Sequence, residues 1–250
     1  MLVGITGVAA MPTAEVFVEQ SPYWSGAGTP LFGQFSVALK KDTTLGNSQA
    51  SGYAVVKLSR NGSTTHSGKA PNGQAFSSSG QLLSGGRIGL HGALGAASVR
   101  RGFVAGTLVL DGAGNSISGD LRWKLPPLRD VRYPAGLDTM LSPIGDRYVR
   151  ATTAHGALGS AVPVVRTFEF SEGVFAVPVF ADVTFGVPLI ADTFTAPITY
   201  FATSPSIGRI SGYAKPATVR YSFDGIILQL RGEIHGAVRS TTTLSAVGSP

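Results

Sequence analysis

The sequence predicts an all-β, antiparallel protein made of two related halves, each a meander that closes into a barrel-like or sandwich-like unit. Three observations predict this fold class. Runs of alternating, β-branched or aromatic residues recur along the 250-residue chain. Turn dipeptides separate these runs at intervals of about eight to twelve residues. A pattern of three glycines in the first half returns, with the same spacing, in the second half.

Strand signals dominate from the N-terminal region onward. The segment 1–45 is expected to be a strand-bearing arm, because AEVFVEQ (14–20) precedes the clearer repeat. The first β-rich unit then covers 46–150 and the second covers 151–250. The boundary falls in a small, polar, turn-prone segment, RATTAHGALGSAVPV. The predicted strands are 14–20, 32–40, 52–59, 167–180, 180–194, 197–203, 217–223 and 225–232.

Glycine-containing dipeptides predict the turns between these strands. They are Asn61-Gly62, Asn72-Gly73, Gly85-Gly86, Asp111-Gly112 and Asp224-Gly225. The glycine-rich stretch GGRIGLHGALG also indicates turns, since it lacks the lysine and the following helix of a phosphate-binding loop. At the middle of the chain, the prolines of WKLPPLRDVRYPAGLDT (123–139) predict a connector or an edge cover.

The segment GFVAGTLVLDGAGNSISGDLRW (102–123) predicts a hairpin. Its Gly102, Gly106 and Gly119 recur as Gly208, Gly212 and Gly225, each displaced by 106 residues. This echo favours an internal duplication, with glycine at positions that need a positive φ or a close approach of two backbones. The hairpin turn at Asp111 carries one acid and one amide, so we interpret it as a turn and not as a calcium loop.

Composition excludes several classes of protein. Hydrophobic residues make up 43% of the chain, which excludes a disordered polymer, and charged residues only 14%. Serine, threonine and glycine supply the polarity instead, as is typical of crowded assemblies and extracellular proteins. The formal charge of +6 is scattered, so nucleic acid is not an expected partner. The absence of cysteine excludes disulfides, thiolate chemistry and thiolate-bound metals.

Targeting signals are equally sparse. No apolar run approaches the roughly 20 residues of a transmembrane helix. The opening residues, MLVGITGVAAMPTAEV, include a short apolar stretch but no basic region before it, so a signal peptide is not evident. The composition nevertheless favours an extracellular or cell-surface location.

Catalytic and metal-binding patterns are missing from the sequence. The histidines, His66, His91, His155 and His235, show no HxH, HxxxH or HExxH spacing, and no GxSxG elbow occurs. We therefore expect no enzyme activity, no cofactor and no metal site. A hydrolase whose triad or carboxylate pair is assembled only by the fold stays open as a minor alternative.

One segment has a pattern suited to ligand binding. Arg122, Trp123, Arg132 and Tyr133 interleave aromatic rings with cations and could stack a sugar ring or hold an anionic glycan. The alternative is that the tryptophan plugs one end of a barrel while the arginines extend around it to solvent. The second interpretation is favoured.

The motifs GTLVLDG, SGDLRWKLPP and RYPAGLDTMLSPIGDRYV are followed some sixty residues later by GRISGYAKP and YSFDGIILQ. Their order resembles that of β-rich C-terminal repeat modules of very large secreted or cell-surface proteins from bacteria of the Verrucomicrobia and Planctomycetes kind. The resemblance covers about residues 52–245. It departs in the length of those proteins and in the ending GEIHGAVRSTTTLSAVGSP, which lacks their aromatic–glycine run. It implies an exported, non-enzymatic module with no catalytic residues to carry over. The matching residues are Trp123, Tyr133, Pro134, Ala135, Gly136, Gly208, Ser211, Gly212, Phe223, Gly225, Leu228 and Gln229.

We therefore expect a non-enzymatic structural or assembly protein of the cell surface, an extracellular filament or a particle such as a virion. It would form homo-oligomers or polymers through its β-rich surfaces. The alternative is a glycan- or surface-binding module that uses the patch near Trp123 and Tyr133.

Overall fold

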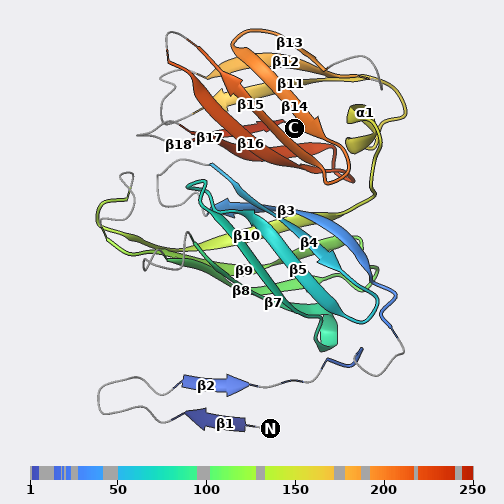
Figure 1. Ribbon diagram of the computed structural model, residues 1–250, viewed down its shortest axis with the longest axis vertical. Coiled ribbons are helices and arrows are strands. Elements are labelled where there is room, and N and C mark those ends of the chain that lie inside the picture. Colours follow the sequence, from blue (N-terminus) through green and yellow to red (C-terminus); the bar gives the residue numbers. More distant parts are fainter. Residues whose placement is uncertain are drawn as a thin grey trace.

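The computed structural model describes residues 2–5, 14–17, 19, 21–23, 28–41, 50–94, 102–127, 133–171, 178–186, 192–216, 219–239 and 244–249. Within these ranges the regular elements are strands, apart from helix α1 (Ala154–Ala157) and the short 3₁₀ turn η2 (Ser84–Gly86). The strands form two eight-stranded antiparallel sheets and one two-stranded sheet. Figure 1 shows the two large sheets as separate curved units, one above the other. The predicted all-β, antiparallel fold with two barrel-like halves is confirmed.

The first large sheet is a nearly closed barrel. Each strand pairs with the next one in the chain except β6 and β7, and the last strand, β10, returns to pair with β3. At the seam between β6 and β7, an isolated bridge joins Leu82 to Ile88. The barrel contains β3 (Gly33–Lys41), β4 (Gly52–Leu58), β5 (Ser63–Lys69), β6 (Ala75–Gln81), β7 (Arg87–Ala93), β8 (Phe103–Leu110), β9 (Ser116–Leu125) and β10 (Leu137–Tyr148).

Strand β7 shows how the sequence specifies an inside and an outside. Its residues alternate strictly between exposed and buried, as the two-residue period of a strand requires. The prediction of turns throughout GGRIGLHGALG is therefore wrong over Arg87–Ala93. Its glycines serve packing instead: a Cβ atom at Gly92 would lie 2.6 Å from the ring of Phe76 on β6. Glycine thus lets the two seam strands approach one another.

The second barrel repeats the same up-and-down plan with a different seam. Its seam lies between β13 and β14, and β18 closes the circuit by pairing with both β17 and β11. Asp192 stabilises the seam, because its carboxylate accepts hydrogen bonds from Gly186 N (3.0 Å) and Thr203 Oγ1 (2.7 Å). The strands are β11 (Val164–Ser171), β12 (Val179–Phe185), β13 (Thr193–Phe194), β14 (Ile198–Ser204), β15 (Arg209–Ala214), β16 (Tyr221–Leu228), β17 (Glu233–Arg239) and β18 (Leu244–Ser249).

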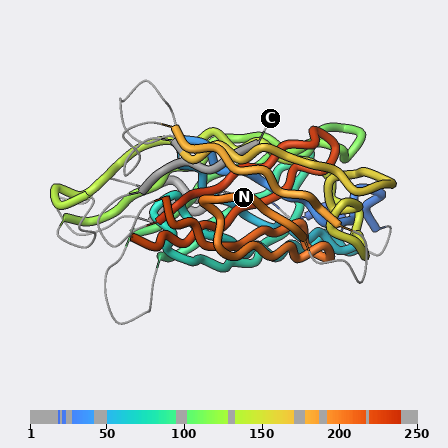
Figure 2. The backbone as a smooth tube through the Cα atoms, turned by 90° about the horizontal axis from the view of Figure 1, so that it is seen from above, coloured from blue at the N-terminus to red at the C-terminus, as the bar shows by residue number. Residues whose placement is uncertain are grey.

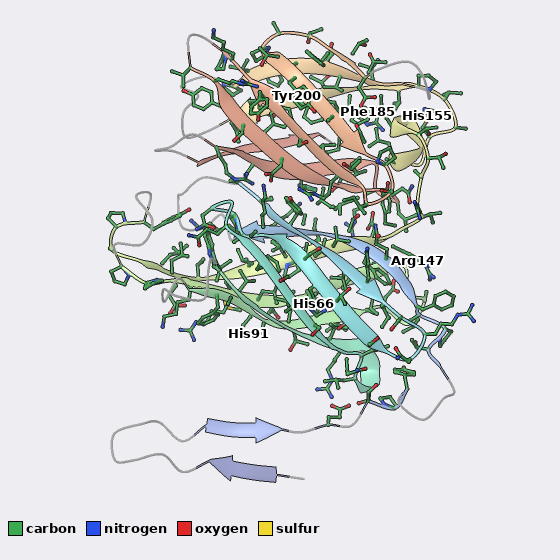
Figure 3. All side chains as sticks on the ribbon, viewed as in Figure 1. His66, His91, Arg147, His155, Phe185 and Tyr200 are labelled. Carbon is green, nitrogen blue, oxygen red and sulfur yellow. The ribbon has the colours of Figure 1, made fainter. Side chains whose placement is uncertain are left out.

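Phenylalanine fills the second barrel. The ring of Phe201 packs edge-on against Phe168 (5.6 Å between centroids) and Phe185 (5.4 Å). Phe170 and Phe223 pack in the same way at 5.5 Å. Such edge-to-face pairs add to the free energy gained from apolar burial. Figure 3 shows the interior of each barrel filled by side chains, with Phe185 labelled in the second.

The glycine echo corresponds to equivalent strands of the two barrels. Hairpin β8–β9 and hairpin β15–β16 are each formed by the second and third strands after a seam. The pairing differs, however. Gly106 lies opposite Leu121, and a displacement of 106 residues would place Gly212 opposite Ile227. Gly212 instead lies opposite Phe223, four residues earlier in the chain. The relationship therefore holds between strands and not between individual paired residues.

The turn predictions are confirmed at four dipeptides and wrong at the fifth. Asn61-Gly62, Asn72-Gly73, Gly85-Gly86 and Asp111-Gly112 all lie between strands. Asp224-Gly225, in contrast, lies inside β16. Asp224 is tolerated there because cations from both barrels surround it. Gly225 is required there because a Cβ atom would lie 2.5 Å from the backbone oxygen of His235.

The predicted N-terminal segment, 1–45, divides into two parts. Strands β1 (Leu2–Ile5) and β2 (Ala14–Phe17) form a hairpin of their own, which Figure 1 shows apart from the barrels. Strand β3 belongs to the first barrel, so that barrel begins at Gly33 and not at residue 46. Helix α1 lies between β10 and β11, within the expected boundary segment, and Thr153 caps it by accepting a hydrogen bond from Gly156 N (3.0 Å).

The two barrels pack directly against each other. In Figure 2, seen from above, the second barrel lies over the first. Strand β16 makes most of this contact with β3, β4 and β10. From Phe223 to Leu228 every residue of β16 is buried, because one face points into its own barrel and the other onto the first barrel. The apolar part of this junction consists of Ala38, Tyr53, Val55, Ile144, Ile226 and Leu228.

Candidate functional site

The structure places Trp123 in the core and not on the surface. Its side chain is fully buried in the first barrel, and the ring of Tyr133 packs edge-on against it at 5.5 Å. The indole therefore has no face open to a sugar ring. Its Nε1 has no hydrogen-bond partner among the described residues. This position matches the interpretation of Trp123 as a side chain that plugs the barrel.

Arg122, the described one of the two cations predicted to accompany this tryptophan, does not form a site with it. Arg122 points outward from β9 and makes a two-point contact with Asp138, 2.6 Å at each oxygen. Lys124 lies 3.6 Å from the same carboxylate. Arg132 lies outside the described residues. The predicted glycan-binding patch thus separates into a buried tryptophan packed against a half-buried tyrosine and, outside the barrel, an exposed ion pair.

The histidines occupy unrelated places, and Figure 3 labels three of them well apart. His66 Nδ1 lies 2.9 Å from Ser78 Oγ inside the first barrel, and burial lowers the pKa of His66 to about 4. His155 Nδ1 contacts the backbone oxygen of Gly186 at 2.9 Å. In the part of the chain that the structure describes, no three histidine or acidic side chains converge to hold a metal ion.

Asp111 has a local structural role. Its carboxylate accepts hydrogen bonds from Asn115 N (2.8 Å), Ser116 N (3.2 Å) and Ser116 Oγ (2.8 Å). These bonds, above all that from Asn115, lower the pKa of Asp111. The carboxylate thus ties together the β8–β9 turn, as expected for a hairpin turn.

The largest concentration of buried charge lies at the junction of the barrels. Asp224 on β16 accepts hydrogen bonds from Lys69 Nζ of the first barrel (2.5 Å) and from both terminal nitrogens of Arg239 (2.5 Å each). Burial opposes ionisation of this carboxyl, but the bonds from Arg239 and Lys69 outweigh it and hold the pKa of Asp224 below its ordinary value. Asp224 is therefore an anion that links the two barrels.

A second buried acid links the barrels at the opposite end of the apolar contact. Asp146 on β10 accepts hydrogen bonds from two nitrogens of Arg231, which lies in the turn between β16 and β17. The distances are 3.0 Å from the backbone N and 2.9 Å from Nε. Beside it, the Gln229 amide bonds to both the N–H and the carbonyl of Val149, which follows β10. Polar bonds thus close both ends of the junction.

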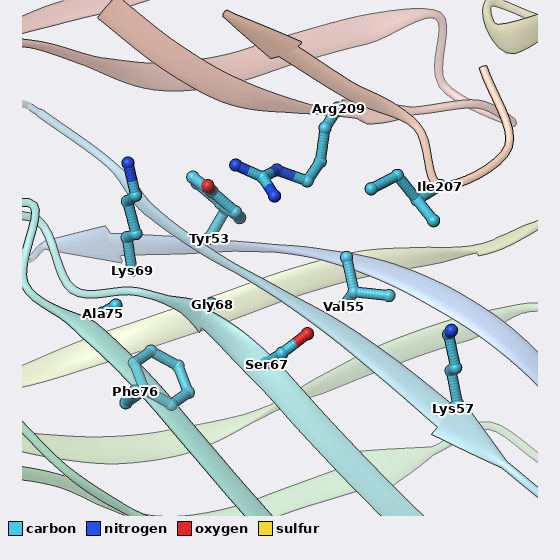
Figure 4. A pocket seen from close by; sticks show the side chains of 10 residues that line it. All are labelled: Tyr53, Val55, Lys57, Ser67, Gly68, Lys69, Ala75, Phe76, Ile207 and Arg209. Carbon is cyan, nitrogen blue, oxygen red and sulfur yellow. The ribbon is translucent and has the colours of Figure 1, made fainter. Parts of the chain in front are cut away.

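A cleft of about 310 Å³ opens between the barrels next to Asp224. Figure 4 shows its walls, with side chains of the first barrel below and Ile207 and Arg209 of the second barrel above. Lys57, Lys69 and Arg209 line it together with apolar side chains, and none of its described lining residues carries a carboxylate. The Arg209 guanidinium lies over the ring of Tyr53 at 5.2 Å, and burial raises the pKa of Tyr53 to about 12. The phenol is consequently a neutral hydrogen-bonding group.

A second hollow, of about 210 Å³, adjoins the first, and Lys69 lines both. The strand register explains its composition. Tyr200 lies opposite Tyr213, Tyr213 opposite Ser222, and Ser222 opposite Arg239, so one row of outward side chains crosses β14 to β17. In the neighbouring row, Ser211 lies opposite Asp224. We call the two hollows together the junction groove.

Aromatic rings form the open end of the junction groove. Tyr200 and Tyr213 are exposed, and their ring centroids lie 5.8 Å apart. The Arg220 guanidinium lies over the Tyr213 ring at 3.6 Å. The combination of exposed aromatic rings, hydroxyl groups and cations can contact a sugar ring and an anionic substituent at the same time.

Sequence reasoning did not predict the junction groove. Its residues come mainly from β4, β5, β6, β14, β15, β16 and β17, so no continuous motif contains them. A signal was present in YSFDGIILQL: an acid within a long apolar run indicates a buried carboxylate with partners elsewhere. The interpretation of Asp224-Gly225 as a turn placed Asp224 outside a strand, so its buried carboxylate was not predicted.

Comparison with protein-family models, with curated proteins and with solved structures finds no match to this chain. Across the described ranges, none of the helices has the length and apolar character needed to cross a membrane.

Proposed function

We propose that this protein is a non-enzymatic structural module of a cell surface, an extracellular filament or a particle, and that it assembles with copies of itself. One observation carries the proposal. Most of the large apolar side chains that the structure describes as exposed lie on the second barrel or its flanking turns. They include Val162, Val165, Phe180, Phe194, Tyr200, Tyr213, Val219 and Leu230.

The outer face of β11 and β12 is the contact surface that we propose. Val165 on β11 and Phe180 on β12 are exposed by 54% and 57%, on two strands that pair directly. The register places Thr184 opposite Val165 and Glu169 opposite Phe180, so the two apolar groups are separate contact points on a mixed face. Contact with another copy would remove both from water, which favours association. The junction supports the same function, since Asp224 and Asp146 hold the two barrels of each copy together.

Size-exclusion chromatography with light scattering tests the proposal. The wild-type chain should elute with a mass above that of one chain, and Phe180→Ser should lower this mass because it removes the largest apolar group from the contact surface. Val109→Ser is the matched control, since Val109 is exposed on β8 of the first barrel. An equal effect of both substitutions would contradict the proposed surface.

The extracellular location and the relationship to bacterial cell-surface repeat modules remain part of this proposal. They are supported by the low charge content, the abundance of glycine, serine and threonine, and the motif order from Trp123 to Gln229. Export would place the junction groove in contact with the surroundings of the cell.

A second candidate function is binding of a glycan, and the junction groove favours it. The groove combines exposed tyrosines, small polar residues and cations, whereas the side chain of Trp123 is fully buried. A screen of immobilised glycans with wild type and Tyr200→Ser tests this function. Retention that does not depend on Tyr200 would contradict the junction groove as the site.

A further inference from the structure

We infer that the junction groove binds an acidic polysaccharide, one whose sugar rings carry carboxylate or sulfate groups. This inference rests on the second candidate function above and names its class of ligand. It is carried by the shape of the groove, the position of its aromatic rings and the sign of its charge.

The shape suits an extended chain and not a compact small molecule. Two open hollows, of about 310 and 210 Å³, have Lys69 in common as a lining residue and therefore lie next to each other in the junction groove. Strands of both barrels line it. A polymer can occupy both hollows at once, and the contacts made in each then add to its affinity.

The aromatic end can accept the face of a sugar ring. Tyr200 and Tyr213 project from paired positions on β14 and β15, and both are exposed, 49% and 37% respectively. Beside them, Ser211 and Ser222 line the hollow and offer hydroxyl groups that donate or accept hydrogen bonds. Because Arg220 lies over the ring of Tyr213, the sugar ring would stack on Tyr200 and present its own hydroxyls to these serines.

The charge selects an anion. Lys57, Lys69, Arg209 and Arg239 line the two hollows, whereas Asp224 is the one carboxylate among their described lining residues. Asp224 can neutralise only one of these cations. Arg220, stacked on Tyr213, adds a further positive charge at the aromatic end. An acidic polymer would therefore meet cations at both ends of the groove, with apolar and hydroxyl groups between them.

Affinity electrophoresis of the purified chain tests the inference. The probes are polygalacturonate as a carboxylated polymer, heparin as a sulfated polymer and dextran as a neutral one. Polygalacturonate or heparin should retard the protein, and high salt should reduce this retardation. The polymer that retards the protein more strongly identifies the preferred anionic group, carboxylate or sulfate. Dextran should leave the mobility unchanged.

Two substitutions at opposite ends of the groove locate the site. Lys57→Gln removes an exposed cation and Tyr200→Ser removes an exposed ring, so neither is expected to affect folding. Each should weaken binding of the acidic polymer by about fivefold. Arg150→Gln is the control, because Arg150 is exposed outside the groove; it should bind as wild type does.

The possible outcomes separate the inference from the function on which it rests. Equal weakening by Arg150→Gln and Lys57→Gln would overturn the inference, since general attraction to a basic chain would then explain binding. If dextran binds as strongly as the acidic polymers and its binding depends on Tyr200, the inference of an acidic ligand would be overturned. The glycan site itself would then be supported. Failure to bind any of the three probes would overturn both.

Discussion

Trp123 shows how one residue can fit two opposite functions in the sequence and only one in the structure. Its neighbours Arg122 and Lys124 are exposed, so the local sequence has the appearance of an aromatic and basic patch. The period of two in β9 turns the cations outward and the indole inward. The alternation of apolar Leu121, Trp123 and Leu125 with charged Arg122 and Lys124 favours an inward tryptophan already in the sequence, and the structure places it there.

Replacing Trp123 tests its role in the core. Trp123→Ala should lower the free energy of unfolding by about 3–5 kcal/mol, because it leaves a large cavity beside Tyr133. Trp123→Phe should cost less, since it keeps most of the ring and removes an unpaired N–H. Urea denaturation measures both, with Arg122→Ala as a surface control that should change little. A small effect of Trp123→Ala would contradict the assigned core position.

His66 makes the stability depend on pH. Burial lowers its pKa to about 4 in the folded protein, while in the unfolded chain it stays near 6.5. The unfolded state therefore binds the proton first, and the stability present above pH 6.5 is lost as the pH falls toward 4. By pH 4.5 the loss should reach about 2 kcal/mol.

Urea denaturation of wild type and His66→Gln between pH 7 and pH 4.5 measures this effect. The wild type should become less stable as the pH falls, and His66→Gln should flatten most of the slope. A smaller slope should remain in the variant, because burial also lowers the pKa of His235. His91→Gln, at an exposed position, is the control. An unchanged slope in His66→Gln would contradict the assignment.

At the scale of elements, the glycines of hairpin β8–β9 are set by backbone proximity. Gly106 has a φ of +153°, and a Cβ atom there would lie 2.2 Å from the backbone oxygen of Asp120. Gly106→Ala should therefore destabilise the protein by about 2 kcal/mol or more. Gly112→Ala, in the turn of the same hairpin, is the control, since a Cβ atom there meets nothing within 4 Å.

Thermal unfolding followed by circular dichroism compares these two variants. Gly106→Ala should show a clear fall in Tm, and Gly112→Ala should stay close to wild type. Equal Tm values for the two would contradict the close approach of β8 and β9.

Most strands could be predicted from the sequence because their signal is local. The strands at Gly33–Lys41 and Gly52–Leu58 match their predicted ranges to within a residue or two. Strands rich in serine, threonine or glycine were not predicted: β5 has few apolar residues, and the glycines of β7 indicate turns. Both segments form strands because neighbouring strands of the barrel pair with them, although their own residues have a low preference for strands.

At the scale of the whole molecule, the junction makes the two barrels interdependent. Leu228 at the end of β16 is fully buried in the apolar contact between them. Leu228→Ala should cost about 2–4 kcal/mol and weaken the coupling of the barrels. Leu230→Ala, two residues later at a position exposed by 61%, is the control.

Differential scanning calorimetry distinguishes coupled from independent barrels. The wild type and Leu230→Ala should each unfold in one transition, and Leu228→Ala should show two. A single unshifted transition in Leu228→Ala would mean that the contact contributes little to stability.

Neither the junction nor the junction groove could be predicted from the sequence. The residues that build them, such as Lys69 and Asp224, are 155 positions apart, and only the folded barrels bring them together. Composition did suggest an assembly protein, but not its contact surface. That surface depends on which face of β11 and β12 is left outside after the barrel closes.

The most direct test of self-assembly is sedimentation equilibrium of the wild-type chain over a wide range of concentrations. We predict that the weight-average mass rises with concentration above the 25.8 kDa of one chain. A mass that stays at 25.8 kDa at every concentration would contradict the proposed function.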